Sequence, residues 1–250
     1  EEALALIDVD YEVLTPVLNG REGMKANAPL IHPNQTTKVM AFRFDPGTDS
    51  GEKSNIEGRS QLKLGDIDAG FKEADVIVER EFTTSWVHQG YIEAQNATAH
   101  WNNDGNITVW NSSQGTFNQR QLMAEILKHP VSKIKMVPQE IGGGFGGKIP
   151  VYLEVPAAML SRKTGHPVKM TMTRSEVFEG TGPASAAQIK AKIGATKDGK
   201  ITAAYAELVF EAGAFPGSAV GAGAQGMFTA YNIENVLIDG YDVVVNKPKS

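Results

Sequence analysis

Apolar and polar residues alternate with a period of two in several short segments of the chain, which predicts β-strands. Residues 96–101 and 107–110 flank an Asp-Gly turn and predict a hairpin. Residues 189–195 and 201–210 predict a second hairpin around Asp198 and Gly199. Residues 76–84, VIVEREFTT, alternate in the same way and predict a further strand.

Other segments have the spacing and boundaries of helices. Apolar residues recur at helical spacing over residues 117–127, and His129-Pro130 predicts the end of that helix. Asp66 is a suitable N-cap for a short helix through residue 74. Residues 151–163 predict an apolar helix closed by Gly165. Strands and helices do not alternate strictly, so the predicted fold class is α+β.

The first quarter of the chain predicts a domain boundary. Residues 1–7 predict the end of a helix that leads into an extended segment over residues 8–14. Residues 29–58 are rich in Pro, Asn, Gly and Asp around one strand candidate at residues 38–44, which is typical of a connector. We place the boundary near residues 50–60.

Composition narrows the classes of function. The chain has 250 residues, 41% of them hydrophobic, and a net charge of -5 with both signs scattered. It has no basic stripe for nucleic acid and no long apolar run or basic amphipathic face for a membrane. We therefore expect neither partner, and a cytoplasmic location. The absence of cysteine excludes cysteine-ligated iron–sulfur clusters within these residues.

A glycine-rich loop, GGGFGGK at residues 142–148, is the strongest candidate site. Such a run lets backbone N–H groups approach an anionic or oxo-bearing ligand closely. Two general motifs match it weakly. The phosphate loop of nucleotide triphosphatases needs Ser or Thr after the lysine, and Ile149 stands there. The dinucleotide-binding G-x-G-x-x-G needs an acidic residue about 20 positions on, and none is suitably placed.

A resemblance covers much more of the chain. GGGFGGK, preceded by ITVWNSSQ and followed by GHPVKMTMTRSE, ATKDGKI and FEAGAF, resembles in order and spacing the molybdenum-cofactor subunit of the molybdenum hydroxylases. That family includes xanthine dehydrogenase, aldehyde oxidase and aerobic carbon monoxide dehydrogenase. The resemblance implies that residues 1–54 are the end of an α/β-hammerhead domain plus a connector. Residues 55–250 would be the first part of the mixed α+β molybdopterin-binding domain.

The resemblance also implies roles for single residues. Gln114 corresponds to the glutamine that hydrogen-bonds an oxo ligand of the metal. Phe145 corresponds to the residue whose backbone amide approaches the metal's oxygen ligands and whose ring walls the substrate pocket. The cofactor loop is shaped by four glycines: Gly143, Gly144, Gly146 and Gly147. The contact of Lys148 is left open between a phosphate and a protein carboxylate. Glu93 and Glu140 are expected to form structural salt bridges.

Departures from the family pattern bear on the substrate. Purine-oxidising members carry glutamate where Ile149 stands, so a purine is disfavoured and an aldehyde, an aromatic heterocycle or a carbon monoxide-like substrate is expected. The family's general-base glutamate is expected beyond Ser250, so we expect these residues alone not to turn over.

The implied cofactor is molybdopterin cytosine dinucleotide or a related form. The implied partners are an iron–sulfur (2Fe–2S) subunit, an FAD subunit and the remainder of the molybdenum subunit, in an oligomer. A non-catalytic scaffold for such subunits is the alternative from another class.

Overall fold

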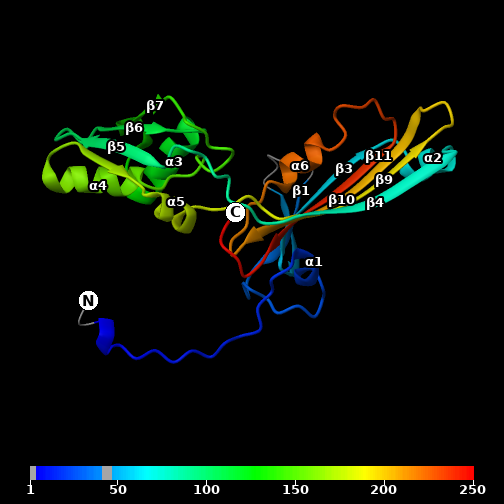
Figure 1. The fold of residues 1–250 in the computed structure, drawn as a ribbon, viewed down its shortest axis with the longest axis horizontal. Coiled ribbons are helices and arrows are strands. Elements are labelled where there is room, and N and C mark those ends of the chain that lie inside the picture. Colours follow the sequence, from blue (N-terminus) through cyan, green and yellow to red (C-terminus); the bar gives the residue numbers. More distant parts are fainter. Residues whose placement is uncertain (1–3, 41–46) are drawn as a thin grey trace. The chain divides into compact units, whose positions relative to one another are not determined.

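The computed structural model describes residues 4–40 and 47–250. The chain divides into two units, each described by itself below: Trp86–Ala184 forms one, and the segments before and after it, Glu1–Ser85 and Ser185–Ser250, form the other. In Figure 1 the inserted unit is mainly green, and the discontinuous unit runs from blue to cyan and from yellow to red.

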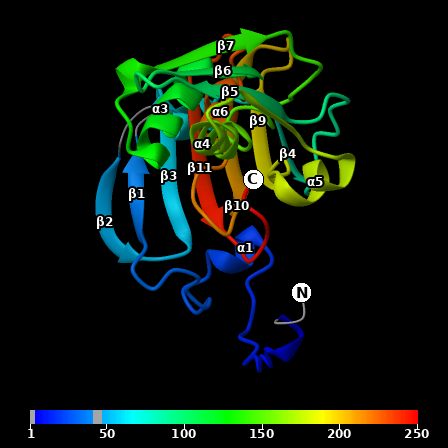
Figure 2. The ribbon, with the colours of Figure 1, turned by 90° about the vertical axis from the view of Figure 1, so that its left-hand side faces the viewer.

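The discontinuous unit contains a seven-stranded sheet in the order β2-β1-β3-β11-β10-β9-β4. Its strands are β1 (Thr36–Met40), β2 (Thr48–Lys53), β3 (Ile56–Leu64), β4 (Val76–Thr84), β9 (Ala187–Ala195), β10 (Ile201–Gly213) and β11 (Val236–Val244). The pairs β1–β3 and β10–β11 are parallel, and the other neighbours are antiparallel. Figure 2 shows the central strands side by side.

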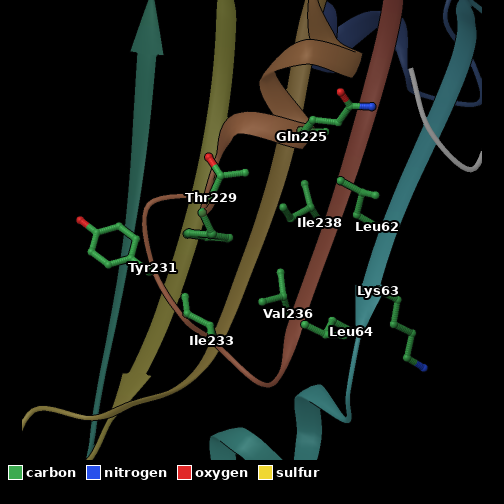
Figure 3. A pocket seen from close by; sticks show the side chains of 11 residues that line it. Leu62, Lys63, Leu64, Gln225, Thr229, Tyr231, Ile233, Val236 and Ile238 are labelled. Atoms are coloured by element: carbon green, nitrogen blue, oxygen red, sulfur yellow. The ribbon is translucent and has the colours of Figure 1, made fainter. Parts of the chain in front are cut away.

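Four short helical elements accompany this sheet: a 3-10 turn η1 (Leu4–Leu6), α1 (Gly20–Gly23), α2 (Ile67–Lys72) and α6 (Val220–Gly226). Helix α6 packs on β3, β10 and β11, where Leu208, Val220 and Ile238 are buried in one apolar cluster. A cavity of about 270 Å³ opens beside this cluster, lined mainly by apolar side chains such as Leu62, Ile233 and Val236 (Figure 3). Its lining offers shape but few hydrogen-bonding groups.

The inserted unit contains a four-stranded sheet in the order β7-β6-β5-β8, with β6 and β7 parallel and the other pairs antiparallel. Its elements are β5 (Asn96–Trp101), β6 (Ile107–Ser112), α3 (Thr116–Leu127), the 3-10 turn η2 (Val131–Lys133), β7 (Ile134–Gln139), α4 (Glu154–Thr164), β8 (Val168–Thr171) and α5 (Arg174–Gly180). Helices α3 and α4 pack on the sheet.

The core of the inserted unit is built from apolar side chains of three strands, β5, β6 and β7, and of two helices, α3 and α4. Ala97 and Ala99 of β5 alternate inward, and Met123 of α3 is fully buried among them. Because buried methionine truncated to alanine leaves a cavity, we expect Met123→Ala to lower the free energy of unfolding by about 2–5 kcal/mol. Chemical denaturation measures this, with exposed Met159 as the control: Met159→Ala should cost less than about 0.5 kcal/mol.

Most expected elements are confirmed. Both hairpins form around glycines with positive φ, Gly105 and Gly199, and residues 76–84 form β4 as expected. The side chain of Asp66 accepts the amides of Asp68 and Ala69 and so caps α2. Helix α3 ends with Lys128 in the left-handed conformation, just before His129-Pro130.

Four expectations differ from the structure. The helix expected over residues 151–163 begins only at Glu154, which places Pro156 in the first turn, where its missing N–H removes no helical bond. The residues 29–58, expected as a connector with one strand, supply β1, β2 and the start of β3. The strand expected at residues 38–44 is β1, at Thr36–Met40, and residues 41–44 lie outside the described residues.

At the start of the chain, only the 3-10 turn η1 is present, and residues 1–3 lie outside the described residues. Leu4 and Leu6 are exposed there, so no packing supports a longer helix. Within residues 4–40 and 47–250, no helix is both long and apolar enough to cross a membrane.

Candidate functional site

The glycine loop, residues 142–148, lies between β7 and α4 in the inserted unit. At its apex the amide of Gly147 donates to the carbonyl of Gly144 at 2.7 Å, which closes a tight turn. The two central residues of that turn, Phe145 and Gly146, both have positive φ, +48° and +95°. A turn with two positive φ values is of type I′ and favours glycine, so Phe145 holds a conformation that is unusual for a bulky residue.

Three successive amides of this loop are left for a ligand. The N–H groups of Gly142, Gly146, Gly147 and Lys148 donate to protein oxygens. The amides of Gly143, Gly144 and Phe145 donate to no acceptor in the part of the chain that the structure describes. Consecutive free amides in a glycine turn form a concave array of donors, which suits an anion or an oxo group.

Gln114 lies directly against this loop. Its side-chain oxygen Oε1 accepts the amides of Gly146 and Lys148, both at 3.0 Å, and its own backbone amide donates to the carbonyl of Lys148 at 3.1 Å. Backbone amides can only donate, so it is Oε1 of Gln114 that faces the amides of Gly146 and Lys148. The Nε2 group, which is a donor, faces away from them. Gln114 is exposed, and its Nε2 group donates to no acceptor within the described residues.

The space beside Gly144 fits Gln114 closely. A methyl group on Gly144 would lie 2.5 Å from Gln114 Oε1 and 2.6 Å from Cδ. Alanine at this position would therefore force the side chain of Gln114 to move, even though the φ of Gly144 lies outside the positive region. The side chain of Gln114 occupies the place that any residue with a Cβ would take.

Glu93 and Lys148 hold the loop from its base. Lys148 Nζ lies 2.5 Å from Glu93 Oε2, and the same oxygen accepts the amide of Gly142 at 2.8 Å. The Lys148 side chain is 1% exposed and its ammonium lies 5.1 Å from the centre of the Tyr91 ring. The partner of Lys148 is therefore a protein carboxylate, and the expected structural salt bridge of Glu93 is confirmed.

The Glu93 carboxyl has a lowered pKa. Burial alone would raise this pKa, but the Lys148 ammonium and the Gly142 amide outweigh burial and lower it. A carboxyl whose folded pKa is depressed stabilises the fold above its unfolded pKa, about 4.3 for glutamate, and this contribution disappears as pH falls through the folded pKa.

We expect Glu93→Gln to lower the free energy of unfolding by about 1–3 kcal/mol at pH 7, since bonds to a charged group are lost. The difference between variant and wild type should begin to shrink as pH falls below the unfolded pKa of about 4.3, and it should vanish only once pH has fallen through the depressed folded pKa of Glu93. Denaturation curves across this pH range measure it. If the difference in the free energy of unfolding between Glu93→Gln and wild type did not change with pH, the conclusion that the Glu93 carboxyl is ionised in the folded protein would be contradicted.

A layer of polar side chains supports the loop from below, and sequence reasoning missed it. Gln95 Nε2 donates to the hydroxyl of Tyr91 and to the carbonyl of Gly147, the latter at 3.3 Å. Gly147 is itself restricted, because a methyl group there would lie 2.6 Å from the ring of Tyr91. Tyr91, Glu93 and Gln95 alternate in the sequence, but the chain bends at residues 92 and 93, so the alternation alone did not indicate that all three support the loop.

A second buried network fixes the chain after the loop. Gln119 Nε2 donates to the carbonyls of Lys148 and Pro150, at 3.1 and 2.9 Å. Asn111 Nδ2 joins Gln119 to Glu154 through two bonds of 2.7 Å. These side chains come from β6, α3 and α4. The packed core of the unit therefore fixes the backbone that follows the loop, at residues 148–150.

The remaining expected site residues lie at the surface. Phe145 is 72% exposed, and its ring edge would be 3.2 Å from a methyl group on Gly143. Ile149 is also exposed, and its side chain lies next to Gly115, at the start of α3. Glu140 is exposed and forms no ion pair within the described residues, so the structural salt bridge expected for it is absent there.

The structure weakens both general motifs. The Lys148 ammonium is buried and paired with Glu93, so it is not free to meet a nucleotide phosphate. The sheet order β7-β6-β5-β8, with an antiparallel hairpin at its centre, is not the parallel sheet of a dinucleotide-binding fold.

The fold is of the α+β class, and its glycine loop offers neutral hydrogen-bond donors. Within the described residues, no group of three or more His, Cys, Asp or Glu side chains could hold a metal ion. A sequence profile of the molybdopterin cofactor-binding domain matches residues 48–250. The chain therefore belongs to this domain family of the molybdenum hydroxylases, as the resemblance in sequence implied.

Relatives and solved structures agree with this assignment. The nicotinate dehydrogenase large molybdopterin subunit of Eubacterium barkeri is 30% identical over 253 residues, covering 100% of this chain and 55% of the relative. The carbon monoxide dehydrogenase large chain of Afipia carboxidovorans is 30% identical over 219 residues, covering 86% of this chain and 26% of the relative. Both names are those of oxidoreductases.

Among solved structures, a reconstituted CO dehydrogenase from Oligotropha carboxidovorans matches with a TM-score of 0.75 and 29% identity, over 100% of this chain and 31% of that one. An aldehyde oxidoreductase from Desulfovibrio gigas shares the fold, with a TM-score of 0.78 and 24% identity over 97% of this chain and 25% of that one. The chain thus spans about half the length of the first relative and about a quarter to a third of the others.

Proposed function

We propose that the glycine loop and Gln114 hold the molybdenum cofactor of a molybdenum hydroxylase, and that Gly143, Gly144 and Phe145 provide its backbone donors. The observation that carries this proposal is the set of three successive amides, unpaired within the described residues, beside Gln114, whose oxygen is already engaged. The cradle fits the group, because oxo ligands accept hydrogen bonds and the glycines leave no Cβ in the way.

In this proposal each residue has a distinct role. Gly143, Gly144 and Phe145 donate main-chain N–H groups, and Gln114 donates through Nε2. Gly146 and Gly147 allow the type I′ turn that presents these donors. Donors fixed before the reaction cost no reorganisation when negative charge develops near them. The bound cofactor supplies the oxidation of an activated carbon with oxygen from water.

The residues near the loop favour particular substrates. We infer that the side chains of Phe145 and Ile149 line the substrate pocket, and that both present apolar surface. An apolar side chain at 149 cannot replace the glutamate that purine-oxidising members use to hydrogen-bond the purine ring, so a purine is disfavoured. An aldehyde, an aromatic heterocycle or a carbon monoxide-like substrate fits this surface better. The names nicotinate dehydrogenase and carbon monoxide dehydrogenase among the relatives agree with this range, whereas the name probable hypoxanthine oxidase, given to an Escherichia coli relative, is that of a purine-oxidising enzyme.

We further infer the setting of this domain. Residues 55–250 form the first part of the molybdopterin-binding domain, and residues 1–54 the end of a hammerhead domain with its connector. The alternation of exposed Ile7, Val9, Tyr11 and Val13 supports this, because it is the pattern of a strand that pairs elsewhere. The general-base glutamate would lie in the remainder of the subunit.

The partners follow from the chemistry of the proposed reaction. Electrons must leave the cofactor, and these residues contain no cysteine for a cluster. We therefore infer a 2Fe–2S subunit and an FAD subunit in a cytoplasmic oligomer. The words "large molybdopterin subunit" and "large chain" in the names of relatives support a multi-subunit protein.

The test is the cofactor content of the full-length protein purified from its own host. We expect about one molybdenum per subunit by mass spectrometry, with cytidine or a related nucleotide released by acid. Protein without molybdenum, from a host that fills its other molybdoenzymes, would contradict the proposal and favour the scaffold alternative.

A further inference from the structure

Glu93 joins the two ends of the glycine loop through a single oxygen atom. Its Oε2 accepts the amide of Gly142, the first residue of the loop, and the ammonium of Lys148, the last. The amide of Glu93 also donates to the carbonyl of Gly142 at 3.2 Å, and Oε1 accepts Asn96 Nδ2 at the same distance. The backbone amide and Oε2 of Glu93 thus hold the base of the loop, and Oε1 is held by Asn96 of β5.

Lys148 connects Glu93 to Gln114 and so to the apex of the loop. Its side chain is bound by Glu93, whereas its backbone amide is bound by Gln114 Oε1. The same Gln114 oxygen accepts the amide of Gly146. A chain of contacts therefore runs from the Glu93 carboxylate through Lys148 to Gln114, whose Nε2 is the side-chain donor of the site.

We propose that Glu93 is a positioning residue of this site, which acts through buried Lys148 to fix Gln114 and the free amides of the loop. The identity of the ligand that these donors bind rests on the proposed function. The contacts by which Glu93 and Lys148 hold the donors do not depend on it. Lys148 is suited to this role because its side chain is almost fully buried, so the ion pair has little competition from water.

The geometry distinguishes this role from that of an ordinary surface ion pair. Glu79 and Lys190 also form a pair at 2.7 Å, but both side chains are well exposed and join two neighbouring strands, β4 and β9. Such pairs contribute little, because water screens them. Glu79→Gln is therefore a matched control: the same chemical change at a pair of similar length that touches no loop amide.

The test compares Glu93→Gln, Lys148→Met, the double variant and Glu79→Gln in the full-length protein. The first readout is amide hydrogen exchange at Gly146 and Lys148, whose N–H groups touch Gln114 rather than Glu93. We expect exchange there to be about tenfold faster in Glu93→Gln and Lys148→Met, because exchange reports local opening. The double variant should exchange no faster than either single one, because both break one chain of contacts.

The second readout is the rate at which molybdenum leaves the protein during dialysis. Glu93→Gln should lose it about tenfold faster than wild type, a difference of about 1.4 kcal/mol in retention, and Glu79→Gln should match wild type. If Glu93→Gln does not fold, Glu93→Asp keeps the charge at a shorter reach and should show a smaller effect of the same sign.

Unchanged exchange at Gly146 and Lys148 in Glu93→Gln would overturn the inference, even where molybdenum is present. Effects of the two single variants that simply add in the double variant would overturn it as well. Wild-type protein without molybdenum would instead contradict the proposed function, and the exchange measurement would still decide the role of Glu93.

Discussion

Gly144→Ala is expected to remove most of the molybdenum from the full-length protein while leaving it folded. The new methyl group would lie 2.5 Å from Gln114 Oε1, so Gln114 must move. Its bonds to Gly146 and Lys148 would then break, and Nε2 would leave the free amides. Loss of one hydrogen bond to a charged group costs about 1.5–3 kcal/mol, which corresponds to roughly a 10- to 150-fold weaker hold on the cofactor.

The matched control is Gly180→Ala, in the same unit. Gly180 is exposed at the end of α5 and lies outside the positive-φ region, and a methyl group added there would meet no heavy atom within 4 Å. This variant should retain molybdenum as wild type does. Metal content by mass spectrometry and unfolding curves together separate loss of cofactor from loss of fold. Equal molybdenum in Gly144→Ala and Gly180→Ala would contradict the close fit between the loop and Gln114.

Gln114 is the second position with a large expected effect, because it both accepts from the loop and donates outward. Gln114→Ala removes both roles, whereas Gln114→Glu keeps an acceptor for Gly146 and Lys148 and loses the donor. We expect the loop amides to exchange faster only in Gln114→Ala. Both variants should lose catalytic rate, by about 100- to 1000-fold, as is typical when one preorganised donor is removed.

This pair of variants separates structure from chemistry at one side chain. Hydrogen exchange at Gly146 and Lys148 measures the role of Gln114 Oε1 as an acceptor, and kcat measures the role of Nε2 as a donor. If Gln114→Glu retained wild-type kcat, donation by Nε2 would play no part in the reaction. Slow exchange in Gln114→Ala would show that the loop is held without this residue.

The elements that were predictable from the sequence are those set by local chemistry. The Asp-Gly turns at residues 104–105 and 198–199 fixed both hairpins, because glycine accepts the positive φ that these turns require. Asp66 marked the start of α2, and Gly165 the end of α4. The glycine loop was recognisable for the same reason, because glycine accepts the positive φ values and the close backbone approach of a tight turn.

Contacts between distant segments were not predictable in this way. Glu93 and Lys148 are 55 residues apart, and only the packed unit brings the carboxylate to both ends of the loop. The expectation that residues 29–58 form a connector with one strand was wrong in part, since they supply β1, β2 and the start of β3. Gly and Asp are frequent both in linkers and in the turns between strands, so composition does not distinguish the two. The domain boundary at residues 54 and 55 stays a prediction, as do the roles of Phe145 and Ile149 toward a substrate.

The central claim is that the molybdenum cofactor lies against Gln114 and the free amides of Gly143, Gly144 and Phe145. Anomalous diffraction at the molybdenum absorption edge, from crystals of the full-length protein, tests it most directly. We predict one strong peak per subunit, facing this loop and the side chain of Gln114. A peak at another place in the subunit, or crystals of active protein with no peak, would contradict the account.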